Sequence, residues 1–397
     1  MKIVGFETLM ANAGLRNYLF IRIRTDSGLT GVGEATLEWQ EKAVQTLAHE
    51  WVEGRILGRD PFDIEAVIGG MVRDQYQGGS TVMTAISGTE VAMWDLIGKA
   101  CGQPVYRLMG GRCHETISAY ANGWYGGAST PGEFASRARE AVGRGYRALK
   151  FDPFGTAWKE LEGPQAEIAV DRVAAVREAV GPNVGLMIEF HGRLSAGAAL
   201  EMIRRLEVFR PVWCEEPVAP ECLDLLAEVK RGVRVPVAAG ESLYSLADFW
   251  RLASLRAADV VQMDLAHCGG LLAGKKIAAM AAVQDLRVAF HCSIGPVALA
   301  ACLHFDASTP NFFVQEAFAD FDVPWRNRFV RGWNPIRKGE VLVPDTPGLG
   351  VELDDEAIAR HPYVANAFPS LRDDRWLTDF SQDGGERDAR NYEETYL

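Results

Sequence analysis

From about residue 116 onward, short apolar runs alternate with longer amphipathic runs, and the alternation repeats eight times. The apolar runs have the length of strands. The amphipathic runs carry helix signals, and Thr130, Pro131 and Glu133, for example, form a predicted capping box. Strands that alternate with helices pair in parallel through right-handed crossovers. Eight such units within about 200 residues predict a (β/α)8-type barrel, an α/β fold, whose last helix is replaced or joined by elements of the N-terminal domain. The predicted strands are ISAYAN, YRALKFD, VGLMIEF, VWCEE, VPVAAGE, DVVQMD, RVAFH and FFVQE.

The chain before and after this repeat shows a different pattern of apolar and polar residues. In YLFIRIRTDSGLTGVGEA, apolar and polar residues alternate around DSG, which predicts two antiparallel strands joined by a turn, and GTEVAMWDLIGKACG predicts a helix that stops at a glycine. We therefore predict an α+β capping domain over residues 1–115, the catalytic barrel over residues 116–320, and a C-terminal segment over residues 321–397 that packs on the capping domain. That segment is turn-rich. It contains a predicted short hairpin at GEVLVPDTPG and a polar tail, SQDGGERDARNYEETYL, predicted to lie on the surface or to be partly disordered.

Charge and composition argue against several classes of function. The 397 residues carry a net charge of −12, and no run of Lys and Arg is longer than a pair or so. This argues against nucleic-acid binding and offers no attraction to an anionic membrane. No apolar run approaches the roughly 18 residues that span a membrane, and we find no charged-then-apolar signal at the N-terminus. The seven cysteines include no CxxC pair, and we interpret them as reduced thiols of a cytoplasmic protein.

Ionisable residues stand at or near the C-terminal ends of seven consecutive predicted strands. A single glutamate in such a position is usually a cap for the next helix, and a single histidine is usually structural. Seven strands in succession have no simple packing explanation, and in a (β/α)8 barrel their ends meet at one mouth, where active sites lie. The set is therefore a predicted catalytic site: Lys150 and Asp152, Glu189 and His191, Glu215 and Glu216, Glu241, Asp264, His291, and Glu316.

Glu189, Glu215 and Glu241 are carboxylates on adjacent predicted strands. Without a cation between them they would repel one another and raise one another's pKa values. Mg²⁺ favours such a site, with a few carboxylates and the remaining positions left to water and substrate oxygens. The sequence offers no thiolate or clustered histidine ligand set here, which argues against Zn²⁺. We therefore predict Mg²⁺ as the cofactor.

Two imidazoles are predicted to flank the substrate. Asp264 and His291 end adjacent strands, and a carboxylate beside an imidazole fixes its tautomer and raises its basicity, so this pair is a predicted general base. His191 follows Glu189 by two residues, which in an extended strand places both on one face. We expect Glu189 to face the metal and His191 to face the substrate. One imidazole can then take a proton while the other gives one to a leaving group.

At these residues the chain resembles the enolase superfamily, in its mandelate racemase-like subgroup. The resemblance covers nearly the whole chain. It includes GVGEA and ISGTEVAMWDLIGKACGQPVYRLMGG in the capping domain, then the strand-end carboxylates, the Asp–His dyad and the final glutamate in order. It implies Mg²⁺ on the three carboxylates and removal of a proton next to a substrate carboxylate, which gives a metal-stabilised enediolate. It also implies that Glu316 is a hydrogen-bond donor or electrophile at that enediolate, and that the protein is a homo-oligomer.

Within that superfamily, EFHGR, HCSIGPVALAACLH and QE resemble sugar-acid dehydratases of the galactonate type, and YANGWY with ALKFDPFG resembles gluconate dehydratases. The resemblance implies that a small-molecule aldonic acid loses water from C2–C3 and becomes a 2-keto-3-deoxy sugar acid. His291 is then the expected base for the C2 proton and His191 the expected acid for the 3-hydroxyl, although the reverse assignment is open. The predicted substrate contacts are Lys150, Asp152, Arg193 and Trp325, and for Trp325 core packing is an equally good interpretation.

Two departures from the family pattern bear on the reaction. Racemases of the subgroup carry Lys-x-Lys on the second strand where this chain has Lys150-x-Asp152, which disfavours racemisation with two lysine bases. Glu189 stands where galactonate dehydratases have aspartate, which leaves galactonate itself open as the substrate. The alternatives are a sugar-acid epimerase or racemase, or a lactone cycloisomerase, on the same scaffold. In a different class is a Schiff-base aldolase that uses Lys150, which leaves the three carboxylates unexplained.

Overall fold

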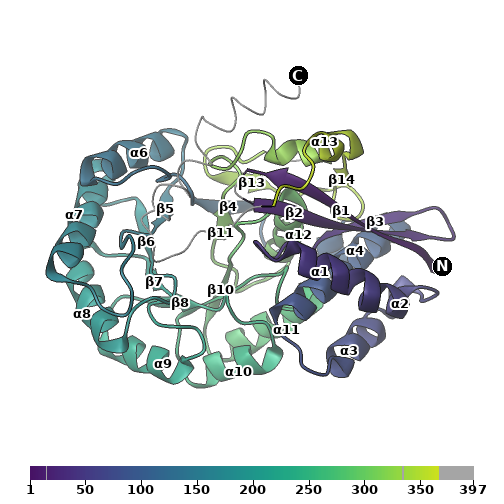
Figure 1. The fold of residues 1–397 in the computed structure, drawn as a ribbon, viewed down its shortest axis with the longest axis horizontal. Coiled ribbons are helices and arrows are strands. Elements are labelled where there is room, and N and C mark those ends of the chain that lie inside the picture. Colours follow the sequence, from purple (N-terminus) through teal and green to yellow (C-terminus); the bar gives the residue numbers. More distant parts are fainter. Residues whose placement is uncertain (15, 333–334, 366–397) are drawn as a thin grey trace.

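The computed structural model describes residues 1–14, 16–332 and 335–365. Figure 1 shows two parts side by side: a ring of strands enclosed by helices, and an N-terminal sheet covered by helices. The first is the predicted (β/α)8-type barrel and the second is the predicted α+β capping domain, so the fold class is confirmed. The domain boundaries at residues 115 and 320 stay a prediction.

The capping domain is built on a three-stranded antiparallel sheet in the order β1-β2-β3. Its strands are β1 (Ile3–Ala13), β2 (Arg16–Thr25) and β3 (Thr30–Glu34), and the predicted turn at DSG joins β2 to β3. Its helices are α1 (Glu41–Leu47), α2 (Glu53–Ile56), α3 (Ile64–Asp74), α4 (Ser80–Cys101) and α5 (Val105–Leu108). Gly102, in the left-handed conformation, ends α4 as predicted. A Cβ on Gly33 would lie 1.9 Å from the carbonyl oxygen of Gly88, so glycines let β3 and α4 pack closely.

The barrel sheet contains the eight predicted strands, all parallel, in the order β10-β9-β8-β7-β6-β5-β4-β11. Backbone pairing between Val288 of β10 and Phe312, just before β11, closes the ring. Bulky side chains such as Tyr120, Met187 and Trp213 fill the interior, so the barrel has a packed core. The strands are β4 (Thr116–Ala121), β5 (Ala148–Phe151), β6 (Gly185–Glu189), β7 (Trp213–Glu215), β8 (Val237–Ala239), β9 (Val260–Met263), β10 (Arg287–Phe290) and β11 (Gln315–Ala317).

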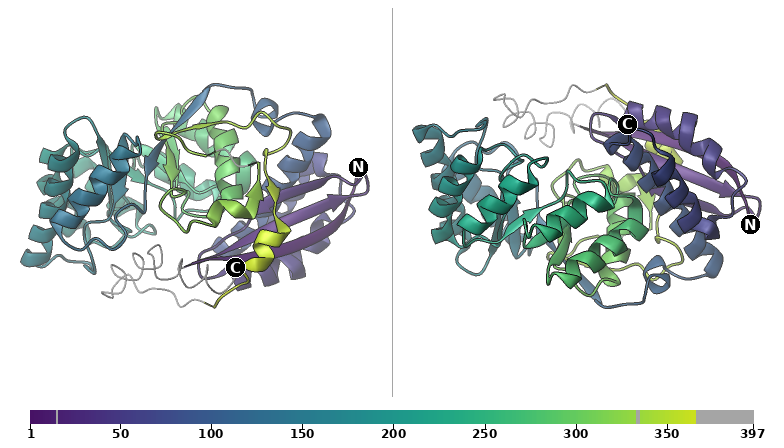
Figure 2. Two further views of the ribbon diagram at one scale, coloured as in Figure 1. Left: turned by 90° about the horizontal axis from the view of Figure 1, so that it is seen from above. Right: turned by 90° about the horizontal axis from the view of Figure 1, so that it is seen from below.

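Seven helices alternate with these strands: α6 (Pro131–Gly143), α7 (Gly163–Val180), α8 (Ala196–Leu206), α9 (Leu223–Gly232), α10 (Leu246–Ser254), α11 (Gly270–Val283) and α12 (Pro296–Ala307). Thr130 and Glu133 form the predicted capping box at the start of α6. Within the described residues β11 is followed by a 3-10 turn, Arg326–Phe329, and no barrel helix comes after it. Figure 2 shows the capping domain against this side of the barrel, where α4 contacts α11 and β3 contacts α12. None of the helices that the structure describes is long and apolar enough to cross a membrane.

The predicted hairpin at GEVLVPDTPG is wrong. Its first arm, β13 (Glu340–Leu342), pairs antiparallel with Thr116–Ser118, the part of β4 that precedes its pairing with β11. Pro344 and Pro347 lack the N–H donors that a returning arm would need. The rest of this segment pairs β12 (Val330–Arg331) with β14 (Glu352–Leu353) and places α13 (Asp355–Arg360) against β1. The predicted polar tail lies outside the described residues.

Candidate active site

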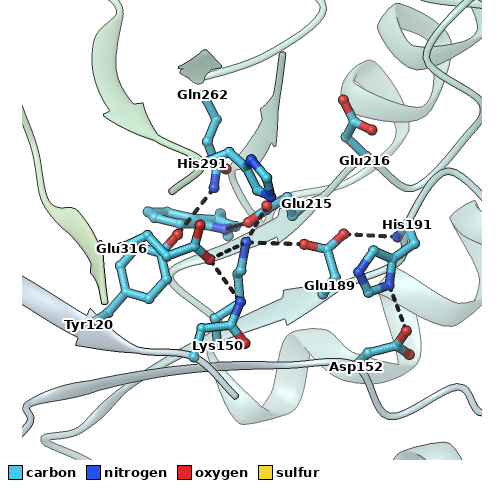
Figure 3. Close-up of polar contacts among 12 residues, drawn as sticks. Tyr120, Lys150, Asp152, Glu189, His191, Glu215, Glu216, Gln262, His291 and Glu316 are labelled. Atoms are coloured by element: carbon cyan, nitrogen blue, oxygen red, sulfur yellow. Dashed lines mark hydrogen bonds and ion pairs between the residues drawn. The ribbon is translucent and has the colours of Figure 1, made fainter. Parts of the chain in front are cut away.

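The predicted site residues come together at the C-terminal edge of the barrel sheet. Each lies in the last part of a strand or in the first turn after it, and Figure 3 shows many of them around one centre. Parallel strands of a closed barrel bring their carboxyl ends to one face, so residues far apart in the sequence share one site. They are Lys150 in β5 with Asp152 after it, Glu189 in β6 with His191 after it, Glu215 in β7, Glu241 after β8, Asp264 after β9, His291 after β10, and Glu316 in β11.

Glu189, Glu215 and Glu241 form a compact acidic group. One carboxylate oxygen from each lies within 4.8 Å of the others, a spacing that a single cation can bridge. Burial and the charge of Glu189 raise the pKa of Glu215 to about 8, and burial also raises the pKa of Glu241. Trp213 Nε1 donates to Glu215 Oε2 at 2.9 Å. The backbone N–H of His191 donates to Glu189 Oε1 at 2.8 Å, so protein donors orient two of the three carboxylates.

Lys150 supplies a positive charge beside this acidic group. Its Nζ lies 2.5 Å from Glu215 Oε1, 2.8 Å from Glu316 Oε1 and 3.3 Å from Glu189 Oε2 (Figure 3). Burial alone would lower the pKa of this 2% exposed side chain, but Glu215 and Glu316 outweigh burial and raise the pKa well above its ordinary value. Lys150 is therefore an ammonium ion directed at carboxylates, whereas Schiff-base chemistry requires the neutral amine.

The structure brings His291 and Asp264 together. His291 Nδ1 lies 2.8 Å from Asp264 Oδ2, and the backbone N–H of Ala266 donates to Asp264 Oδ1 at 2.7 Å. Burial would lower the pKa of His291, but Glu241 and the hydrogen bond to Asp264 raise the pKa well above its ordinary value. Because Asp264 engages Nδ1, Nε2 is the ring nitrogen that remains for proton transfer.

His191 and Asp152 form a second imidazole–carboxylate pair, which was not predicted from the sequence. His191 Nδ1 is 2.7 Å from Asp152 Oδ2 (Figure 3). Arg193 donates to both carboxylate oxygens of Asp152, and the backbone N–H of Phe154 donates to Asp152 Oδ1 at 2.9 Å. Burial would raise the pKa of Asp152, but the charge of Arg193 and the hydrogen bond from His191 lower the pKa to about 2. The signal that could have revealed this pair is the adjacency of the two predicted strands that end in Asp152 and His191.

The prediction that His191 lies in an extended strand is wrong. Strand β6 ends at Glu189, and His191 has a φ of +48°, in the left-handed region, so the chain has already turned at the imidazole. This turn, instead of strand alternation, directs the ring toward Asp152. The side chain of Arg193 is 0% exposed, and it also donates to the carbonyl oxygen of Gly155, so its described partners are protein groups.

Glu316 accepts hydrogen bonds at both of its oxygens. Asn122 Nδ2 donates to Oε1 at 2.7 Å, beside Lys150, and the backbone N–H of Cys292 donates to Oε2 at 2.6 Å. Burial would raise the pKa of Glu316, but Lys150 and His291 lower the pKa to about 2. Glu316 is thus an ionised acceptor in this structure, whereas the family resemblance implied a donor or an electrophile.

Trp325 lies in a layer between the capping domain and the C-terminal segment. Its side chain is 3% exposed, and its indole N–H donates to the carbonyl oxygen of Asn12 at 3.0 Å. Its ring stacks on His361 with ring centres 5.3 Å apart. These contacts favour core packing over substrate contact as the role of Trp325.

Glu216 lies outside the acidic group that could hold a metal, although it follows Glu215 directly. Its φ of +36° turns the side chain away, and its carboxylate accepts the N–H of Gly240 at 3.2 Å and the hydroxyl of Ser242 at 3.1 Å. Both donors flank Glu241. Glu216 therefore stabilises the turn that carries the third carboxylate.

Two known domain families match this chain. Residues 4–110 match the mandelate racemase/muconate lactonizing enzyme N-terminal domain, and residues 133–357 match the enolase C-terminal domain-like family. The chain belongs to the enolase superfamily. Both domains of its mandelate racemase/muconate lactonizing enzyme group are present in order, as the resemblance in the sequence implied.

Several related enzymes carry named activities. A D-gluconate/D-galactonate dehydratase of Picrophilus torridus is 36% identical over 87% of this chain and 88% of its own length. A D-gluconate dehydratase of Thermoproteus tenax is 32% identical over 90% of this chain and 72% of its own length. A D-galactonate dehydratase of Xanthomonas euvesicatoria pv. vesicatoria is 36% identical over 91% of this chain and 94% of its own length. Among solved structures, a mandelate racemase/muconate lactonizing enzyme from Jannaschia sp. CCS1 has a TM-score of 0.85 at 31% identity, covering 92% of this chain and 99% of that chain.

Proposed function

We propose that this enzyme dehydrates an aldonic acid to a 2-keto-3-deoxy sugar acid. The observation that carries the proposal is the presence of two imidazoles near one acidic group, each hydrogen bonded to its own carboxylate. Removal of the C2 proton requires a base, and departure of the 3-hydroxyl requires an acid, so two separate imidazoles provide one of each. The names of the related enzymes support the same class of reaction and a small sugar acid as substrate.

The acidic group fits a divalent cation, and we propose Mg²⁺. Glu189, Glu215 and Glu241 offer hard oxygen ligands, which suit Mg²⁺ better than Zn²⁺. Besides burial, repulsion between these carboxylates raises the pKa values of Glu215 and Glu241, and a bound cation would relieve it. When bound, Mg²⁺ polarises the substrate carboxylate and thereby acidifies the neighbouring C–H bond.

We assign His291 as the base. Burial favours the neutral His291 ring and the charge of Glu241 favours the protonated ring, so a cation bound at the acidic group would offset that charge and leave the ring neutral. In the neutral ring, the hydrogen bond to Asp264 holds the proton on Nδ1 and leaves the lone pair of Nε2 for the C2 proton. As Nε2 takes the proton, the ring becomes an imidazolium ion, and the nearby carboxylate of Asp264 stabilises its charge. The electrons of the C2–H bond move toward the carboxylate group as an enediolate, and they return to form the C2–C3 double bond when the 3-hydroxyl leaves.

We assign His191 as the acid. Burial would lower the pKa of His191, but Glu189 and Asp152 raise the pKa to about 9, so the ring carries a proton near neutral pH. Nε2 gives that proton to the 3-hydroxyl as the C3–O bond breaks and water leaves. The enol that remains across C2 and C3 becomes the 2-keto-3-deoxy acid by tautomerisation, so the product is the substrate minus one water.

The predicted substrate contacts divide into two kinds in this proposal. Lys150 lies beside the acidic group, and we retain it as a contact for the substrate carboxylate. Asp152 and Arg193 instead act through His191, because their described hydrogen bonds are to that ring, to each other and to the backbone. For Trp325 we favour a role in packing.

The alternatives have less support. An epimerase or cycloisomerase shares the removal of the C2 proton, and an epimerase could use the second imidazole to return a proton to C2, but the related enzymes named above are dehydratases. A Schiff-base aldolase needs Lys150 as a free amine, and the carboxylates around Lys150 favour its ammonium form.

The test is a screen of the purified protein against aldonic and aldaric acids, beginning with gluconate and galactonate, with a colour assay for 2-keto acids. We expect a 2-keto product whose formation stops in EDTA and resumes with Mg²⁺, and His291→Asn should reduce the rate at least about 10²-fold. Incubation in D₂O distinguishes epimerisation, which would label C2 without loss of water. Mg²⁺ binding without turnover of any acid would refute the proposal.

A further inference from the structure

Glu34, the glutamate of the GVGEA motif in the capping domain, directs its carboxylate into the barrel. Its Oε1 accepts the N–H of Gly295 at 2.6 Å, and its Oε2 accepts the N–H groups of Val297 and Ala298 at 3.2 and 3.0 Å. These donors are the free N–H groups at the start of α12, where a negative charge is favoured. A Cβ on Gly295 would lie 2.4 Å from Glu34 Oε1, so the carboxylate occupies the space that a side chain would need.

Glu34 is one of several partners of residues 291–295, the short segment between β10 and α12. We call this segment the base loop, because it begins with His291. Arg16 Nη1 donates to the carbonyl oxygen of Ser293 at 2.7 Å, and the Ser293 hydroxyl donates to Glu38 Oε1 at 3.2 Å. Arg16 and Glu38 also form an ion pair with each other. The capping domain thus holds the base loop through both Ser293 and Gly295.

Two further contacts anchor the remaining residues of the base loop. The backbone N–H of Cys292 donates to Glu316 in β11, and Arg326, which is buried, donates to the carbonyl oxygen of Ile294. Every residue from Cys292 to Gly295 therefore bonds to a partner outside the loop. A loop anchored at each residue has little freedom to open, so the position of the His291 backbone is set by these partners.

We propose that Glu34, Arg16 and Glu38 are positioning residues that fix the base loop, and that through it the capping domain controls the rate of proton removal. The inference rests on the proposed role of His291 as the base. The capping-domain residues act through the backbone of Ser293 and Gly295, two and four residues from the imidazole. A displacement of about 1 Å caused from a distance can reduce a catalysed rate about 10²-fold.

The experiment compares three variants of the full chain with a matched control. Glu34→Gln keeps the shape of the side chain but places an NH₂ group against backbone N–H donors. Arg16→Lys keeps the charge but loses Nη1, the single nitrogen that donates to both Ser293 and Glu38. Glu38→Gln tests the same contacts at a partly exposed position, in case either buried variant fails to fold. The control is Arg22→Lys, because Arg22 also lies on β2 in an ion pair, with partners in β1 and α13.

Two readouts separate positioning from general loss of stability. Hydrogen–deuterium exchange followed by mass spectrometry reports the backbone amides of residues 291–298, and steady-state kinetics reports kcat and KM at saturating Mg²⁺. We expect faster exchange in this segment and a kcat about 10- to 100-fold lower in the test variants, with KM and Mg²⁺ affinity close to wild type. The control should change none of these quantities.

Each contrary result has a distinct meaning. Unchanged exchange over residues 291–298 in the folded variants would overturn the anchoring by the capping domain, whatever the substrate of the enzyme is. Faster exchange with an unchanged kcat would overturn the control of catalysis. A wild-type protein that dehydrates no acid would refute the proposed function instead, and the exchange measurement would still decide whether the capping domain holds the loop.

Discussion

Replacing Asp264 with asparagine changes a single group and, we expect, removes the base. The Oδ1 of Asp264 accepts the N–H of Ala266 at 2.7 Å, so the amide oxygen of the asparagine must stay on that side. The amide NH₂ then faces His291 Nδ1, which lies 2.8 Å from the present Oδ2. Nδ1 must become an acceptor, the ring proton moves to Nε2, and Nε2 can no longer take the C2 proton.

A wrongly held imidazole tautomer of this kind reduces kcat by about 10⁴-fold in a comparable His–Asp pair. We therefore expect Asp264→Asn to lose about 10³- to 10⁴-fold in kcat, equivalent to about 4–5 kcal/mol of activation free energy. The assay is the initial rate of 2-keto acid formation with saturating Mg²⁺, together with the rate of C2 proton exchange in D₂O. Both rates should fall together, because both need the lone pair of Nε2.

The matched control is Asp306→Asn in α12. Asp306 is 0% exposed, neither of its carboxylate oxygens has a hydrogen-bond partner among the described residues, and burial raises its pKa well above the ordinary value. Burial therefore favours the neutral form of Asp306, which asparagine matches in shape and charge. A folded Asp264→Asn enzyme that keeps a rate within about tenfold of wild type would refute the tautomer argument.

Three further predictions concern the metal site and the core. Trp213→Phe removes the donor to Glu215, and we expect Mg²⁺ affinity to fall about 10- to 100-fold by titration calorimetry; an unchanged affinity would contradict this. Lys150→Met removes the positive charge from a group of buried carboxylates, so we expect the unfolding free energy in EDTA to fall by about 3–5 kcal/mol. Mg²⁺ should restore part of this loss. Equal losses in EDTA and in Mg²⁺ would contradict the prediction. Burial lowers the pKa of His304 to about 4, against 6.5 unfolded, so between these values the unfolded chain binds more protons and stability decreases as the pH is lowered. The loss from this group is about 2 kcal/mol at pH 5, and urea unfolding should show a smaller fall between pH 7.5 and 5 for His304→Asn, whose amide can still accept the Tyr106 N–H.

Much of the barrel and of the candidate site could be predicted from the sequence, because both depend on a repeated rule. Alternating strand and helix patterns specify parallel pairing, and parallel pairing in a closed ring brings the strand ends to one face. The positions of Glu189, Glu215 and Glu241 follow from that rule alone, without knowledge of any side-chain conformation. The same holds for Asp264 and His291, which end neighbouring strands.

What the sequence could not show depends on local turns and on contacts between distant segments. The pairing of His191 with Asp152 requires a left-handed residue just after β6, and strand alternation gives no sign of it. The burial of Arg193 depends on the turn between Asp152 and Gly155 that surrounds its guanidinium. The GVGEA motif gave no sign of the contacts of Glu34 with the barrel, because the partner Gly295 lies 261 positions further along the chain.

The anchoring of the base loop has a consequence for the order in which the protein is assembled. Arg16 and Ser293 are separated by 277 positions, and Glu34 and Gly295 by 261. On a ribosome the capping domain emerges first, yet these partners become available only after most of the barrel has been synthesised. Contacts of such long range form slowly, because the intervening chain must be ordered first. We therefore expect the barrel strands to form before His291 reaches its final position, so that the catalytic centre matures among the last parts of the molecule to fold.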